Sequence, residues 1–179
     1  MTKVLFSFLL VMSIVTFNPA FAKQNTDWQL SEDGLGPIKI GMTVAQAEKA
    51  AQQKLALEPL GGLGVPVTEA CRFAKFKTGP KDISLMLNNR KIVRIDVKNP
   101  EIKTTQGAHL GSTTQEIKKL YKGQTTVQPN KYVATQETVT VTPKEKTNSR
   151  LIFFGNDKNI IDMISAGRLP EVEYVEGCG

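Results

Sequence analysis

The sequence has few of the residues on which metal sites and most hydrolases depend. It contains one histidine, His109, and two cysteines, Cys71 and Cys178. A zinc site normally uses three or four Cys or His ligands, and no metal-binding spacing such as H-E-x-x-H is present. The G-x-S-x-G motif of serine hydrolases is also absent. We therefore expect no metal, no cofactor and no catalytic residue.

Aromatic residues are scarce as well, at 7% of the chain. The net charge is +6, and the basic residues are scattered except for one cluster, 88–94 (NNRKIVR), which includes Arg90 and Arg94. This cluster falls at a predicted hairpin turn, so it is either a solvated turn or a patch for acidic polymers or membrane surfaces. Basic and aromatic residues do not alternate anywhere, and we expect no nucleic-acid partner.

Long hydrophobic runs are absent after residue 22. Before it, Lys3 precedes an apolar run over 4–17 and a small-x-small site at 20–22, the pattern of a cleavable signal peptide. The run is short for a membrane-spanning helix of about 20 residues, although a membrane anchor is the alternative. We predict a signal peptide over 1–22 cut after Ala22, and a periplasmic or secreted mature chain with no integral membrane segment.

Both cysteines lie in the predicted mature chain. Two cysteines in an oxidising compartment most simply bond to each other. Free-thiol chemistry and metal ligation are the alternatives. We expect a structural disulfide between Cys71 and Cys178, which would tie the end of the chain to its first half.

A short pattern near the start of the mature chain occurs again seventy residues later. When Gly41 is placed on Gly111, residues 38–50 (IKIGMTVAQAEKA) align with 108–120 (AHLGSTTQEIKKL). Each copy has a glycine followed by T-x-x-[QE], a capping box that begins a helix. Apolar residues then recur at helical spacing. We predict helices over 43–55 and 113–122 with the apolar stripes Val44, Ala47, Ala51 and Leu55, and Ile117, Leu120 and Tyr121.

Strand patterns follow each predicted helix. A strand over 71–76 precedes a hairpin over 82–97, and a strand over 131–143 precedes a hairpin over 150–165. The predicted fold class is α+β, with two similar units that each pack a short capped helix on an antiparallel β-sheet. The units would span 23–100 and 101–179, joined by a linker around 98–107.

The doubled G-[MS]-T-x-x-[QE] helix start, followed by antiparallel strands in an exported chain, resembles the tandem repeat of β-lactamase inhibitory protein. It is also similar to the helix-plus-sheet unit of SmpA/OmlA-type outer-membrane assembly lipoproteins. The ends of the chain, 28–43 and 166–179, resemble those of a group of bacterial secreted proteins with this layout. The resemblance implies a two-unit fold that binds other macromolecules. Unlike a lipoprotein, the chain has Lys23 and not Cys after the predicted cut.

These observations lead to a predicted function. We expect an exported, non-enzymatic binding protein, an inhibitor or immunity factor that recognises another protein. Arginine and aromatic residues are typical of binding hot spots. An envelope-maintenance module that binds cell wall or outer-membrane components is the alternative. The candidate partner contacts are Trp28, Tyr132, Arg168, Arg90 and Arg94.

The carboxylates near the C-terminus offer a third hypothesis. If residues 171–176 formed a strand, Glu171 and Glu173 would share one face, and such a pair can hydrolyse glycosidic bonds. The alternative is an exposed polar edge with Val172 and Val175 packing inward. Because no aromatic sugar platform is nearby, we favour the polar edge.

Overall fold

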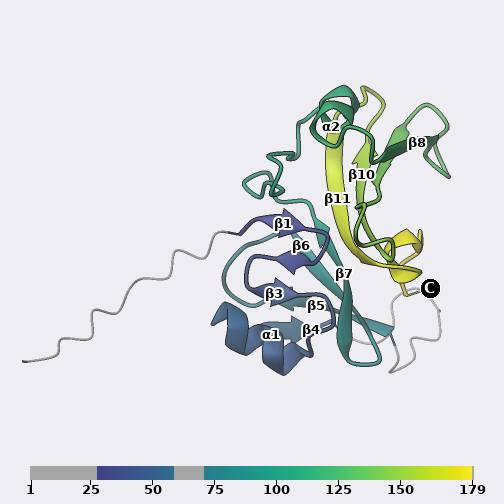
Figure 1. Cartoon of the computed structure of the whole chain (residues 1–179). Helices are drawn as coiled ribbons and strands as arrows, with labels where there is room; N and C mark the ends of the chain where they lie inside the picture. The colour runs from purple at the N-terminus through teal and green to yellow at the C-terminus, as the bar shows by residue number, and fades with distance from the viewer. Residues whose placement is uncertain (1–27, 59–70, 179) are drawn as a thin grey trace, which may run out of the picture.

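The computed structural model describes residues 28–58 and 71–178 (Figure 1). The predicted signal peptide, 1–22, and the start of the first predicted unit lie outside the described residues. The predicted α+β class is confirmed: antiparallel sheet dominates, and the described residues form two α-helices, α1 (Val44–Ala51) and α2 (Thr114–Leu120). Neither helix is long and apolar enough to cross a membrane.

Both helices begin at the predicted capping boxes. The Thr43 hydroxyl accepts from the Gln46 amide at 3.3 Å, and the Gln46 side chain accepts from the Thr43 amide at 2.9 Å. Thr113 and Glu116 form the same pair of bonds at 3.2 and 2.7 Å. Each box satisfies backbone amides that the first helical turn leaves without partners.

The residues just before the two helices also make matching contacts. Gly41 and Met42 exchange hydrogen bonds of 2.7 and 2.8 Å with Ile92. The same exchange, with both bonds at 2.8 Å, joins Gly111 and the following serine to Ile161. The two glycines have φ of 93° and 92°, a conformation that other residues rarely adopt. The glycines therefore turn the chain so that each helix starts against a strand of the sheet.

Eight strands form one antiparallel sheet in the order β4-β5-β6-β7-β11-β10-β9-β8. The four strands after α1 make one half, the four after α2 make the other, and the halves meet where β7 pairs with β11. Both predicted hairpins, β6–β7 and β10–β11, are confirmed. The strands are β4 (Leu55–Leu57), β5 (Cys71–Phe76), β6 (Ile83–Asn88), β7 (Lys91–Val97), β8 (Thr125–Pro129), β9 (Glu137–Val141), β10 (Ser149–Gly155) and β11 (Ile161–Arg168).

A small three-stranded sheet, which no sequence pattern predicts, packs against the first half of the long sheet (Figure 1). Its strands are β1 (Leu30–Ser31), β2 (Gly34–Leu35) and β3 (Ile38–Lys39). The expected linker over 98–107 is also part of the packed structure, since the Leu30 amide donates to the Lys103 carbonyl at 2.9 Å and Ile102 is buried.

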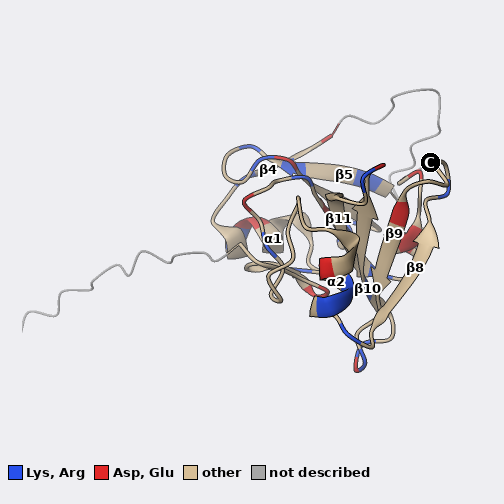
Figure 2. Ribbon diagram, turned by 90° about the horizontal axis from the view of Figure 1, so that it is seen from above, with Lys and Arg blue, Asp and Glu red and all other residues tan. Residues whose placement is uncertain are grey.

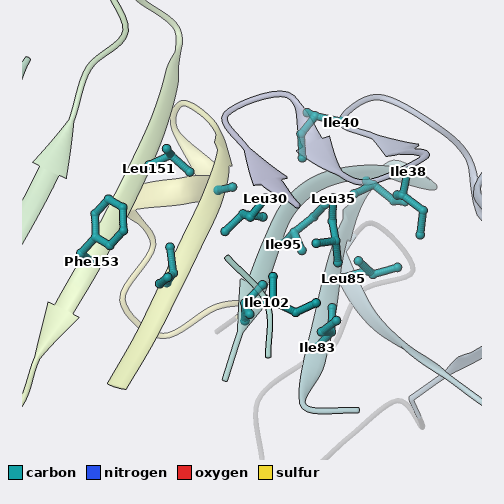
Figure 3. Packing of buried hydrophobic residues seen from close by; sticks show 14 of the residues in the cluster. Leu30, Leu35, Ile38, Ile40, Ile83, Leu85, Ile95, Ile102, Leu151 and Phe153 are labelled. Carbon is teal, nitrogen blue, oxygen red and sulfur yellow. The ribbon is translucent and has the colours of Figure 1, made fainter. Parts of the chain in front are cut away.

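One hydrophobic core lies between the long sheet and the elements that cover it. Both helices are on the same side of this sheet (Figure 2). Figure 3 shows Leu30, Leu35 and Ile38 of the small sheet facing Leu85 and Ile95 of the long one. In the second half, Ile117 of α2 and Tyr121, the residue that follows the helix, join the core, and the centroid of the Tyr121 ring lies 5.6 Å from that of Phe153. We call this side the helix face and the opposite side the open face.

The structure corrects three of the predicted boundaries. Helix α1 ends at Ala51 because Gln52 adopts a left-handed conformation, with φ of 53°, so Leu55 belongs to β4 and not to the helix. Residues 131–136 form a turn, which limits the predicted 131–143 strand to β9. Residues Glu171–Glu173 form a 3₁₀ turn, η1, so the two glutamates do not share a strand face.

Candidate functional site

The C-terminal tail, defined here as residues 171–178, crosses the open face of the sheet. The Asn88 side chain donates to the Glu171 carboxylate at 2.7 Å, which fixes the start of the tail over β6. A Cβ placed on Gly177 would lie 3.0 Å from the Phe73 ring of β5. At its end, Cys178 is bonded to Cys71, with 5.5 Å between the Cα atoms, and the predicted disulfide is confirmed. The tail therefore covers the first half of the open face.

Arg94 of β7 binds the tail through hydrogen bonds to its backbone. Its guanidinium donates to the carbonyls of Glu171 at 3.2 Å and Tyr174 at 2.7 Å, and its Nε lies 3.0 Å from the Asp96 carboxylate. The Ser165 hydroxyl donates to the same carboxylate at 2.5 Å. Arg94 is 8% exposed. Arg94 is one of the predicted partner contacts, but the tail covers it, and we assign it a structural role.

Beside the tail, the second half of the open face contains a hollow of about 440 Å³. Its floor consists of the apolar side chains of Ile152, Phe154 and Met163. Its walls are the tail on one side and the β8–β9 loop on the other, and hydroxyl groups of β9 and β11 supply polar positions. The other residues that line it are Arg94, Gln128, Pro129, Asn130, Lys131, Tyr132, Thr138, Thr140, Ser165, Val172, Glu173, Tyr174 and Val175.

The tail forms a firm wall of the hollow because Val172 anchors it. Val172 is 2% exposed, and with Ile152 and Met86 it is buried apart from the main core. Val175, by contrast, is 45% exposed. The predicted inward packing is thus confirmed for Val172 and wrong for Val175, which points an apolar side chain outward beside the hollow.

Tyr132 bridges the two walls. Its ring is at the rim, 67% of the residue is exposed, and its hydroxyl donates to the Glu176 carboxylate at 3.0 Å. This hydrogen bond raises the pKa of Tyr132 above its ordinary value of 10.0, because the carboxylate favours the protonated phenol.

Removal of the Glu176 charge should lower the pKa of Tyr132 back toward 10.0. The bond contributes stability below the ordinary pKa of the phenol, and this contribution is lost as the pH rises through the raised value. We expect Glu176→Gln to shift the phenolate absorbance titration to lower pH. Tyr132→Phe identifies the transition by removing it, and Glu145→Gln is the control. An unchanged titration in Glu176→Gln would contradict the bridge.

The remaining predicted contacts lie elsewhere. Trp28 is half-buried, and its ring packs edge-on against Phe76 with 5.4 Å between centroids. Arg90 is exposed in the β6–β7 turn. Arg168 is exposed and lines a separate polar hollow of about 520 Å³, where Lys146 forms ion pairs with two acidic residues. Of the five predicted contacts, the structure thus places Tyr132 at the exposed rim of the open-face hollow and Arg94 in its lining, and the other three lie elsewhere.

Sequence reasoning missed the floor of the hollow, although a signal for it exists. Residues 151–154 of β10 are all apolar, so both faces of the strand carry apolar side chains. A strand of this kind is covered on both faces. Leu151 and Phe153 face the core, which leaves Ile152 and Phe154 for the open face.

The described residues contain no cluster of side chains suited to binding a metal ion. His109 is half-buried, and its Nδ1 lies 2.7 Å from the Leu110 carbonyl. Among residues 28–58 and 71–178, no three His, Cys, Asp or Glu side chains are grouped so that they could hold a metal ion.

No protein-family model matches the chain, and no curated protein matches it. Among solved structures, it is similar to the uncharacterized protein YfeY from Escherichia coli, with a TM-score of 0.51 and 18% identity over 78% of this chain and 99% of that one. An extracellular protein containing an SCP domain from Bacillus anthracis gives a TM-score of 0.46 and 7% identity over 90% of this chain and 50% of that one. The similarity to YfeY indicates a shared fold.

Proposed function

We propose that the chain is an exported, non-enzymatic protein that binds another protein through its open face, as an inhibitor or an immunity factor. The observation that carries the proposal is the apolar hollow between the tail and the β8–β9 loop. A stable protein interface typically covers about 800 Å² on each partner. A hollow with an apolar floor and an exposed rim can form the centre of such an area.

The distribution of exposed apolar side chains supports this proposal. Seven large apolar residues are exposed among the described residues, and six of them lie between 120 and 175. Three of the six, Tyr132, Tyr174 and Val175, line the hollow. Tyrosines supply large contact area at a low entropy cost and are common at binding hot spots.

We also propose that the two halves of the chain are related by duplication, as units 23–100 and 101–179. The matching capping boxes, glycine turns and strand contacts support this proposal, together with the mirrored strand order around β7–β11. The disulfide suits an oxidising compartment, which supports export by a signal peptide over 1–22.

Site-specific photo-crosslinking tests the proposed binding face. A photoreactive phenylalanine analogue at Tyr132 or Tyr174, in the tagged full chain expressed in its native host, should give one discrete protein adduct that mass spectrometry can identify. The same analogue at Leu57, which is exposed on the other half, is the matched control. We expect Met163→Glu to abolish the adducts because it places a charge on the apolar floor.

Two results would contradict the proposal. Protein adducts formed equally from Leu57 would mean that the open-face hollow is not the binding site. Adducts with lipid or cell-wall fragments, in place of a protein, would favour the envelope-maintenance alternative.

A further inference from the structure

Strand β8 ends the long sheet with a free edge. It pairs with β9, and hydrogen bonds from Asn130 to Gln136 at 2.7 Å and from Thr142 to Gln124 at 2.9 Å fix the alternation of that pairing. Even-numbered residues of this segment therefore bond to β9, and odd-numbered residues direct their backbone groups away from it.

Thr125 and Val127 thus present N–H and C=O groups to the outside of the sheet. Within the described part of the chain, no group bonds to them. Pro129 ends the edge, because it has a carbonyl and no N–H. An edge of this kind is a template for another strand, and proteins commonly protect such edges.

The opposite edge of the sheet, at β4, is protected in just this way. The Glu48 carboxylate of α1 accepts from the Leu55 amide at 2.9 Å and pairs with Lys54 at 3.1 Å. The Leu55 bond lowers the pKa of Glu48, so the carboxylate stays charged. In the second half, the residue that aligns with Glu48 is Lys118, which lies 3.7 Å from the Glu137 carboxylate. Among the described residues, no carboxylate accepts a hydrogen bond from the Thr125 or Val127 amide of the β8 edge.

The charges beside β8 indicate which kind of strand it fits. Lys122 precedes the strand, Lys131 follows it, both are exposed, and neither forms an ion pair within the described residues. Figure 2 shows further basic residues along α2, which precedes β8. If two copies paired through β8 about a two-fold axis at Val127, Lys122 of one copy would lie opposite Tyr132 of the other, one residue from Lys131. The dimer would bring these like charges near each other at both ends of the edge, which disfavours it.

We propose that the β8 edge binds an extended, acidic segment of the partner protein, which adds a strand to the sheet. The proposal rests on the protein-binding function proposed above. Thr125 and Val127 would bond to the backbone of the added strand, as in other complexes formed by strand addition. Exposed Val127, which pairs with core residue Val139 and so lies on the helix face, would contact its apolar side chains, and the two lysines would pair with its carboxylates.

A display library of short random peptides, selected on the immobilised full chain with its disulfide intact, tests this proposal. We expect the selected peptides to combine β-branched and acidic residues. Their binding should weaken as salt rises. A synthetic copy of the strongest binder is the probe for affinity measurements by calorimetry.

Proline substitutions separate the edge from the rest of the surface. Val127→Pro removes an outward N–H and leaves the β8–β9 ladder intact, since prolines are tolerated at such edge positions. We expect it to weaken peptide binding about tenfold. Thr125→Pro should weaken peptide binding in the same way. It replaces Val127→Pro in the experiment if Val127→Pro does not fold. Val127→Thr keeps the N–H and loses one methyl group, so it should bind more tightly than Val127→Pro. Leu57→Pro alters the other edge of the sheet and should leave binding unchanged.

Several results would overturn the inference. These are a library that yields no binding peptide, selected peptides without acidic residues, equal binding by Val127→Pro, or a wild-type dimer that Val127→Pro dissociates. If Val127→Pro loses the peptide but keeps the protein adducts from Tyr132 and Tyr174, the edge inference fails and the proposed function stands. If wild-type adducts are absent as well, both fail.

Discussion

Removal of the Cys71–Cys178 disulfide is expected to lower the free energy of unfolding by about 4 to 5 kcal/mol. The two cysteines are 107 residues apart, and a bond that closes so long a loop removes a large amount of conformational entropy from the unfolded chain. The folded state changes too, because the end of the tail loses its covalent attachment to β5. The effect should therefore exceed that of an ordinary core substitution.

Denaturant titration of the oxidised protein, the reduced protein and the Cys71→Ser/Cys178→Ser variant measures this effect. Reduced protein and double variant should agree, and a reductant should not change the variant further. If the midpoint shift corresponds to less than about 0.5 kcal/mol, the size of a neutral surface change, the disulfide does not hold the fold together. Hydrogen exchange should accelerate first at the tail amides.

The second large effect is expected for Arg94→Met. The substitution leaves the Asp96 carboxylate, whose side chain is 14% exposed, without its cation, and breaking a buried ion pair typically costs about 3 to 5 kcal/mol. It also removes both hydrogen bonds from the guanidinium to the tail. We expect a loss of about 3 kcal/mol of stability in denaturant unfolding, together with weaker binding at the hollow.

Matched variants separate the buried charge from general effects. Arg90→Met removes an exposed arginine four residues away and should change stability by less than about 0.5 kcal/mol. Arg94→Met/Asp96→Asn should recover part of the loss, because no unpaired charge remains. A single Arg94→Met variant as stable as Arg90→Met would show that the tail is held by the disulfide and Val172 alone.

Local signals explain what the sequence could predict. The two helix starts depend on residues three positions apart, Thr43 with Gln46 and Thr113 with Glu116, so neighbouring residues determine them. The two predicted hairpins likewise follow from alternating residues on each side of a short turn. The disulfide was predictable because the chain has only two cysteines.

Tertiary contacts decided the features that were missed. Strands β1 to β3 have two residues each, too few to show a period. Strand β8 is polar because it lies at the edge of the sheet. Arg94 reads as a surface residue of a basic turn, and only the tail, 77 and 80 residues further along the chain, buries it. The hollow depends on the same tail, so its site could not be located from local patterns.

The seam between β7 and β11 has a consequence for how the protein is made. Ribosomes deliver β7 early, and its neighbour on one side, β11, is the final strand to emerge. Until β11 is made, one edge of β7 has no strand to pair with, and the strand is largely apolar. Nascent chains aggregate through unpaired strand edges of this kind. Chaperones that bind the newly made chain should therefore bind most strongly at β7, Lys91–Val97.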